Sequence, residues 1–198
     1  MGIQTSIVAE AETWQETNAA VHGWRGRCLS ILARGEVAVS ETLLALSGVA
    51  ARGDTVALPH LIGQRMQALA DAIAVDGPFH VEGKRLAPAL EAFRSHAALR
   101  TFLCHAPGTI ARDQAGRWLL VLETLALRAR RGERSTCVVR EAESATILKQ
   151  LTADCQRMVA RLGIFNETIL APLPKAPSEA QRFDGANRRQ RVLDNLPD

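Results

Sequence analysis

An arginine and a histidine five positions apart are the residues of this chain whose types and spacing best suit chemistry. Arg100 and His105 belong to the stretch Arg-Thr-Phe-Leu-Cys-His, which stands directly before Ala-Pro-Gly. A histidine titrates near neutral pH and can move protons, and the planar guanidinium of an arginine matches the oxygens of a phosphate. Together, two such side chains could serve a reaction at a phosphate that needs proton transfer and stabilisation of negative charge. Arg100 and His105 are therefore a candidate catalytic pair.

The stretch stands at the end of a predicted helix, and helix geometry limits how its residues can meet. A step of five residues turns an ideal helix by about 140°, so Arg100 and His105 should not lie on one face. They can converge if the helix frays before Pro107, or if a second copy of the chain supplies the missing partner. His96, four positions before Arg100, shares its helix face.

The spacing Arg-x4-His at a helix end, in a mainly helical chain of this size, resembles the HEPN (higher eukaryotes and prokaryotes nucleotide-binding) domains. Many of these carry Arg-x4–6-His, often followed by a small residue, which is Ala106 here. The resemblance covers roughly residues 25–163. It implies a metal-independent endoribonuclease that acts as a symmetric homodimer, as a toxin or defence component with an antitoxin protein as a partner. Other HEPN members are inactive modules that bind nucleotides or RNA.

Carried over residue by residue, the resemblance makes His105 the general base or acid at the ribose 2′-hydroxyl. It makes Arg100 the group that stabilises charge on the scissile phosphate. The residue after the arginine is commonly Asn, Asp or His in active members, and here it is Thr101. A threonine can donate a hydrogen bond but does not titrate usefully. We expect Thr101 and His96 to contact RNA.

Two other interpretations of Arg100 and His105 stay open. A cationic side chain at the C-terminus of a helix favours the helix dipole, and the arginine could simply pair with an acidic residue. The chain would then be a helical interaction protein in which both residues are structural. Alternatively, it is a non-enzymatic module that binds nucleotide, RNA or protein and keeps a vestigial Arg-x4-His motif.

A basic cluster stands between two candidate strands, where it could contact phosphates beside the site or form a solvated loop. Its members are Arg128, Arg130, Arg131 and Arg134. The whole chain is only mildly basic, with a net charge of +3 and a sequence pI near 8.9. This charge permits an anionic partner such as RNA without requiring one.

The cysteines and the motifs that are absent indicate a reducing compartment and argue against several classes of enzyme. The four cysteines form no Cys-x-x-Cys pair and fit no zinc signature, so free thiols in a reducing compartment are favoured over two disulfides. No phosphate-binding loop, dinucleotide fingerprint or zinc-protease motif is found, and we expect neither a metal nor a cofactor. No signal peptide and no apolar run of membrane-spanning length are evident, which predicts a cytoplasmic protein away from membranes.

The periodicity of apolar residues predicts a mainly α (α+β) fold, a helical bundle with a small antiparallel β-meander before the last long helix. One domain covers residues 1–170, the meander lies at about 109–140, and 171–198 is an extended or disordered tail. A loop or short strand is expected at 79–84. The expected helices cover 7–35, 41–51, 59–74, 86–104 and 141–162, and the expected strands cover 109–113, 118–127 and 135–140.

Overall fold

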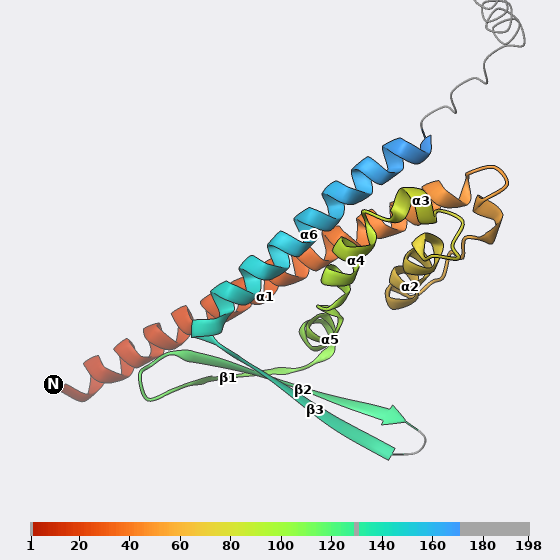
Figure 1. Cartoon of the computed structure of the whole chain (residues 1–198). Coiled ribbons are helices and arrows are strands. Elements are labelled where there is room, and N and C mark those ends of the chain that lie inside the picture. Colours follow the sequence, from red (N-terminus) through yellow and green to blue (C-terminus); the bar gives the residue numbers. More distant parts are fainter. Residues whose placement is uncertain (1, 129–130, 171–198) are drawn as a thin grey trace, which may run out of the picture.

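A computed structural model describes residues 2–128 and 131–170, with side chains over 13–126 and 132–170. Its largest elements are two long helices, α1 (Gly2–Ser47) and α6 (Glu141–Leu170), which lie side by side (Figure 1). A three-stranded antiparallel sheet comes directly before α6. The predicted mainly α fold with a small antiparallel sheet before the last long helix is therefore confirmed. The expected tail lies outside the described residues.

The long helices run in the same direction and enclose the core. The indole Nε1 of Trp24 donates to the carbonyl of Ser144 at 2.9 Å, and Asn166 Nδ2 donates to Thr42 Oγ1 at 3.1 Å. The first bond joins the middle of α1 to the start of α6, and the second joins the end of α1 to a position near the end of α6. The two helices are therefore parallel. Apolar side chains at spacings of three and four fill the seam, as expected for helices stabilised by one packed face. They include Val21, Cys28, Leu32, Val39, Leu43 and Leu46 of α1 and Leu151, Cys155, Met158, Leu162 and Phe165 of α6.

The first helix is continuous, so the prediction of two helices over 7–35 and 41–51 is wrong. Ser40 does not cap a second helix, because its hydroxyl donates to the Glu36 carbonyl at 2.8 Å, one turn earlier. Gly35 weakens an isolated helix but is needed here, because a Cβ at this position would lie 2.4 Å from the ring of Phe93. Packing against the rest of the protein carries the helix through both residues.

A helix predicted over 86–104 is instead two helices, α4 (Ala87–Arg94) and α5 (Ala97–His105). Apolar residues recur at spacings of three and four across the break, at Leu86, Leu90, Phe93 and Ala97, so periodicity could not reveal it. Ser95 donates its hydroxyl to the Ala92 carbonyl at 2.7 Å, a local bond that competes with helix continuation. The break gives α5 an axis of its own, below α4 in Figure 1.

Three further element boundaries differ from the predictions. Helix α2 (Ile62–Ile73) begins after Pro59, whose carbonyl accepts from Arg65 Nε at 2.9 Å. The segment 79–84, which was expected to be a loop or a short strand, contains the short helix α3 (His80–Gly83). A short 3-10 helix, η1 (Gly53–Thr55), precedes α2. Gly163 does not stop α6, because buried Phe165 keeps the next turn packed.

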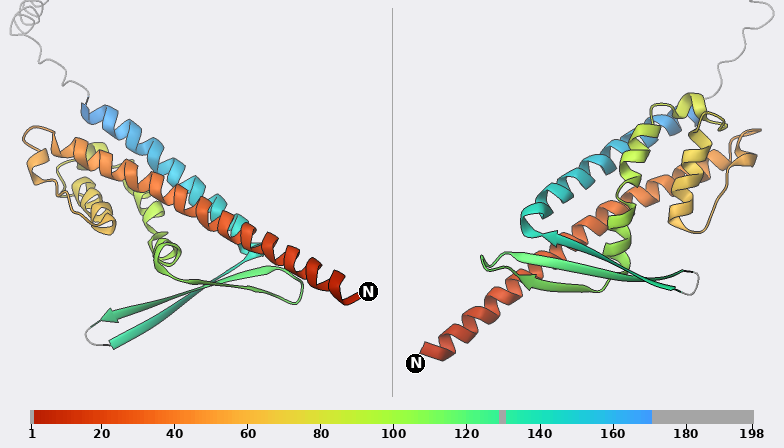
Figure 2. Two further views of the ribbon diagram at one scale, coloured as in Figure 1. Left: turned by 180° about the vertical axis from the view of Figure 1, so that it is seen from behind. Right: turned by 60° about the horizontal axis from the view of Figure 1, so that its bottom comes forward.

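The sheet follows the order β1 (Gly108–Arg112), β2 (Trp118–Arg128), β3 (Arg131–Arg140), which confirms the predicted meander. One face packs on the helices through Leu120, Leu122 and Val139, and the Trp118 ring lies 6.1 Å from that of Trp24. The last strand was expected to begin at 135, but it begins at 131. Most of the segment between the two predicted strands, 128–134, is therefore part of the paired strands. Figure 2 shows the β2–β3 hairpin projecting away from the helices.

All four cysteines are free, with Cys28 and Cys155 buried, Cys137 half-buried and Cys104 exposed. The alternative of two disulfides does not apply to this structure. Within the described ranges, no helix is both long and apolar enough to cross a membrane.

Candidate catalytic site at the end of helix α5

Helix α5 is fixed at its C-terminal end by an arginine from α1. Arg25 donates from Nε and Nη2 to the Leu103 carbonyl at 3.0 and 2.6 Å, and from Nη2 to the Ala106 carbonyl at 3.1 Å. These bonds satisfy carbonyls that lack helical partners, and the positive charge suits the negative end of the helix dipole. The sequence analysis missed Arg25, because no local pattern connects residues so far apart in the chain.

The chain leaves α5 through a close approach to the sheet. A Cβ at Gly108 would lie 3.0 Å from Leu120 Cδ1 and 3.5 Å from Arg25 Nη1. A glycine here lets β1 start directly beneath the helix end. The end of α5 is thus held between α1 and β2.

Arg100 and His105 meet on this fixed helix end. Arg100 Nη1 lies 3.5 Å from His105 Nε2, at the long limit of a hydrogen bond. The helix remains regular to His105, so neither fraying nor a second copy is needed for the contact. The long arginine side chain bridges the rotation that separates the two positions. The structure therefore brings together the two residues that the sequence analysis singled out.

Arg100 also has an acidic partner on α1. Its Nε donates to Glu36 Oε1 at 2.9 Å, and the two side chains are 28% and 22% exposed. This ion pair explains how Arg100 can be partly buried, because a half-buried charge needs a partner. The bond at Nε also fixes the plane of the guanidinium beside His105.

A groove of about 270 Å³ opens beside Arg100, between α1, α2, α4 and α5. Its size is close to the lower limit of small-molecule sites. His96 and Arg100 both line it, as their four-residue spacing on one helix face predicts, whereas His105 lies outside the lining. Apolar and polar side chains contribute to it, among them Leu32, Met66 and Phe93, and Glu36, Glu91 and Arg94.

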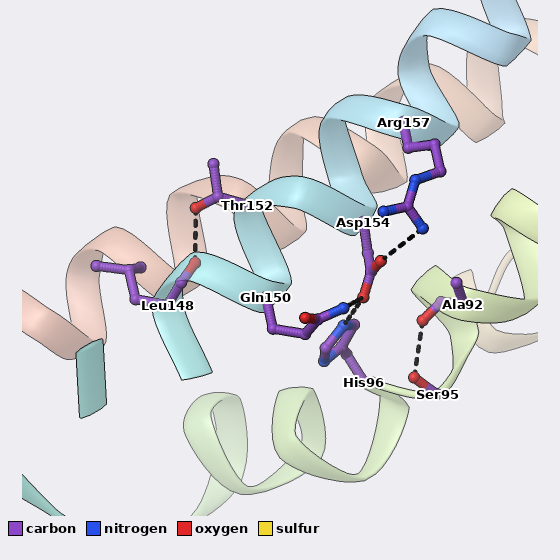
Figure 3. Close-up of polar contacts among 8 residues, drawn as sticks. All are labelled: Ala92, Ser95, His96, Leu148, Gln150, Thr152, Asp154 and Arg157. Atoms are coloured by element: carbon purple, nitrogen blue, oxygen red, sulfur yellow. Dashed lines mark hydrogen bonds and ion pairs between the residues drawn. The ribbon is translucent and has the colours of Figure 1, made fainter. Parts of the chain in front are cut away.

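A carboxylate from α6 holds the side chain of His96 (Figure 3). Its Nε2 lies 3.0 Å from Asp154 Oδ2, and the two side chains are only 14% and 5% exposed. Gln150 donates to the same oxygen at 2.9 Å, and Arg157 Nη1 lies 3.3 Å from Oδ1. The His96 side chain is therefore mostly buried and anchored, rather than a surface side chain.

The environment of Asp154 keeps its carboxylate ionised. Burial raises the pKa of Asp154, but hydrogen bonds from His96 and Gln150 and the charges of His96 and Arg157 together outweigh it, so the pKa lies below its ordinary value of 3.8. The sequence analysis missed Asp154. A signal existed, because Asp154 falls three residues after Leu151 and four before Met158, on the buried stripe of α6.

Thr101 is exposed on the outer side of α5. Its hydroxyl donates to the Ala97 carbonyl at 3.0 Å, within the helix. The hydroxyl proton is thus committed to the backbone, and the oxygen can still accept a hydrogen bond. Thr101 directly follows Arg100 in the chain, but it does not line the groove.

Three members of the basic cluster, Arg128, Arg131 and Arg134, lie toward the far end of the β2–β3 hairpin. Arg128 pairs with Arg131 across the strands, and exposed Arg134 stands opposite Leu125. Arg130 lies outside the described residues. Gly108, three residues after His105, pairs with Leu122, and the strand continues six residues to Arg128, about 20 Å at 3.3 Å per residue. The described members of the cluster are therefore at the end of an arm and not beside Arg100 and His105.

Among the described residues, no group of three or more His, Cys, Asp or Glu side chains is placed to hold a metal ion. Comparisons of the chain with protein-family models, with curated proteins and with solved structures find no match. The function of the site is therefore inferred from its own geometry.

Proposed function

We propose that this chain is a HEPN-like, metal-independent endoribonuclease whose catalytic pair is Arg100 and His105. The observation that carries the proposal is the 3.5 Å contact between Arg100 Nη1 and His105 Nε2 at the open end of α5. A proton-transfer group and a phosphate-binding group adjoin there, and His105 is exposed while Arg100 is partly so. An RNA backbone can reach both.

In the proposed reaction, His105 removes the proton of the ribose 2′-hydroxyl, and the 2′-oxygen attacks the adjacent phosphorus. Arg100 stabilises the negative charge that develops on the phosphate oxygens. Glu36 positions Arg100 by binding Nε, which leaves Nη2 without a partner among the described residues and available to phosphate. The products are a 2′,3′-cyclic phosphate and a 5′-hydroxyl.

We propose further that the protein acts in the cytoplasm as a homodimer, as a toxin or defence component, with an antitoxin protein as a partner. The exposed end of α5 supports this proposal, because it leaves one face of the pair open to a second copy or to an inhibitor. In the dimer, RNA would lie across both copies of the pair. The hairpin arm, with Arg128, Arg131 and Arg134, would contact phosphates farther along the strand. Light scattering after size-exclusion chromatography measures the oligomeric state.

A non-enzymatic module that binds RNA, nucleotide or protein is the second candidate. The observations that favour it are the hydroxyl of Thr101, which is bonded to the backbone, and the charge of Arg100, which Glu36 already neutralises. Such a module would bind RNA or a partner protein without cutting RNA. The same cleavage assay distinguishes the two candidates.

The test is RNA cleavage in excess chelator, with Arg100→Ala and His105→Ala as variants. We expect a loss of about 100-fold or more for His105→Ala, which removes the positioned acid or base, and a similar loss for Arg100→Ala, which removes the stabilisation of charge on the phosphate. Arg140→Ala and His60→Ala are matched controls, because both residues are exposed and neither lines the groove. Circular dichroism checks that every variant folds. An inert wild-type protein, or variants that cut as well as the controls, would overturn the proposal.

A further inference from the structure

The groove beside Arg100 opens at the break between α4 and α5. Ser95 and His96 stand at this break, and both line the groove. The contact of His96 Nε2 with Asp154 Oδ2, at 3.0 Å, ties the break to α6 (Figure 3). This anchored contact keeps one wall of the groove in a fixed position.

The lining of the groove combines apolar side chains with hydrogen-bonding ones. Leu32 and Phe93, both buried, contribute apolar surface from α1 and α4. Glu36 and Glu91 can accept hydrogen bonds, and Arg94 can donate them. The volume, about 270 Å³, lies just below that of sites for drug-sized ligands and suits a single ring system. A nucleobase has apolar faces and an edge of donors and acceptors, so it matches the lining in both respects.

Arg100 connects this groove to the proposed cleavage site. It lines the groove, and its Nη1 lies 3.5 Å from His105 Nε2 at the end of α5. Its Nε is bound by Glu36, and no described residue hydrogen-bonds its Nη2. A phosphate on Arg100 would therefore stand beside the groove, and the nucleoside attached to that phosphate could reach into it.

We propose that the groove binds the nucleobase of the nucleotide whose phosphate Arg100 holds. This inference rests on the proposed ribonuclease function, and it names the part of the RNA that the protein recognises. A base in a duplex is stacked on both faces and paired along its edge, so it must leave the stack before it can enter a pocket. The substrate is then an RNA with an unpaired nucleotide at the cleavage position.

Binding of small probes tests the groove without requiring cleavage. The probes are the 3′-monophosphates of adenosine, cytidine, guanosine and uridine, with ribose 3-phosphate as the probe that lacks a base. We expect at least one nucleotide to bind about 10-fold more tightly than ribose 3-phosphate, the scale of one base packed on a protein surface. Arg100→Ala should weaken the binding of both kinds of probe, because both carry the phosphate. Calorimetric titration measures the dissociation constants.

Two substitutions fill the groove from different helices. Ala97 of α5 is exposed and lines the groove, so Ala97→Trp adds an indole without displacing a core side chain. Gly63 of α2 also lines it, and apart from its chain neighbours and the backbone of its own helix no atom lies within 4 Å of a Cβ added there. Ala97→Trp and Gly63→Phe should each remove the advantage of the nucleotide and leave the binding of ribose 3-phosphate unchanged. Ala98→Trp is the matched control, because Ala98 is exposed on the same helix and does not line the groove.

Circular dichroism checks that each variant folds, and RNA cleavage by the wild type is measured alongside. A protein that cuts RNA but binds no nucleotide more tightly than ribose 3-phosphate would overturn the groove assignment and leave the ribonuclease in place. Folded Ala97→Trp and Gly63→Phe proteins that keep the advantage would do the same. Base-dependent binding that both variants abolish, in a protein that cuts no RNA, would overturn the ribonuclease and leave the groove as the base site of a non-enzymatic module. A protein that shows neither cleavage nor base-dependent binding would overturn both proposals.

Discussion

Glu36 and Arg100 form an ion pair between α1 and α5, with Nε and Oε1 2.9 Å apart. Because the pair fixes the guanidinium beside His105, we predict that Glu36→Gln lowers kcat for RNA cleavage by roughly 10-fold to 100-fold through misplacement of Arg100. The free energy of unfolding should fall by only about 1 kcal/mol, as for a partly exposed ion pair. Cleavage kinetics and urea unfolding measure the two effects.

Glu41→Gln is the matched control, since Glu41 is exposed on the same helix. A Glu36→Gln protein with wild-type kcat would show that Arg100 needs no anchor.

Asp154 should make stability depend on acid pH. Its pKa in the folded protein lies below the ordinary value of 3.8, so its contribution is full above about pH 4 and is lost as pH falls through the folded pKa. Asp154→Ala removes a buried charged partner of His96 and should cost about 3 kcal/mol at pH 7. Urea unfolding at pH 7, 5 and 3 measures the free energy of unfolding of Asp154→Ala and wild type. The difference between the two should be smallest at pH 3.

Asp54→Ala, at an exposed aspartate, is the control and should change the midpoint little at any pH. A difference for Asp154→Ala that grew toward pH 3 would contradict the assignment of the ionised carboxylate.

Two glycines of α1 should respond oppositely to the same substitution. Gly35→Ala places a Cβ 2.4 Å from the Phe93 ring, and such overpacking should destabilise the protein by about 1–3 kcal/mol. Apart from its chain neighbours and the backbone of its own helix, no atom lies within 4 Å of a Cβ added at Gly26, so Gly26→Ala should stabilise the helix by about 0.5–1 kcal/mol. Thermal unfolding of both variants measures the contrast. Equal stabilisation by both would show that α1 and α4 do not approach as closely as described.

The four cysteines should differ strongly in reactivity. Burial raises the pKa of Cys28 to about 11, against a smaller opposing effect of Arg27, and burial raises the pKa of Cys155 as well. Iodoacetamide should modify exposed Cys104 first and half-buried Cys137 more slowly, and should reach the two buried thiols only in denaturant. Peptide mass spectrometry at timed intervals follows each site. Native Cys28 that reacts as fast as Cys104 would contradict the packing of α1.

Cys28 should also make stability depend on alkaline pH. A thiol with a raised pKa contributes stability that is full below the unfolded pKa, near 9, and is lost as pH rises through about 11. Cys28→Ala should therefore flatten the fall in stability between pH 9 and 11, as measured by urea unfolding. A wild-type protein and variant with parallel pH profiles would contradict the raised pKa.

Local patterns predicted the element types well and several element ends poorly. Strand-forming residues and turn residues predicted the order of the three strands. The spacing of apolar residues predicted which face of α6 is buried. Ser40, Gly35 and Gly163 are helix-boundary signals that long-range packing overrides. The break at Ser95 was invisible because the apolar stripe continues through it.

The candidate site was predicted in part. Residue types and spacing identified Arg100 and His105, and helix periodicity placed His96 on the face of Arg100. Glu36, Arg25 and Asp154 were missed, because each acts from a helix far away in the sequence. Arg128, Arg131 and Arg134 were predicted to lie either in a solvated loop or beside the site, and the paired strands instead hold them at the end of an arm.

We propose that the Arg100–His105 pair cuts RNA with the 2′-hydroxyl as nucleophile. The most direct measurement is product analysis after chelator-treated protein meets an RNA oligonucleotide and a copy with 2′-deoxy sugar at the cleavage position. We expect a 2′,3′-cyclic phosphate and a 5′-hydroxyl from the RNA, and no cut at the deoxy position. Cleavage of the deoxy position, or no cleavage of either oligonucleotide, would contradict it.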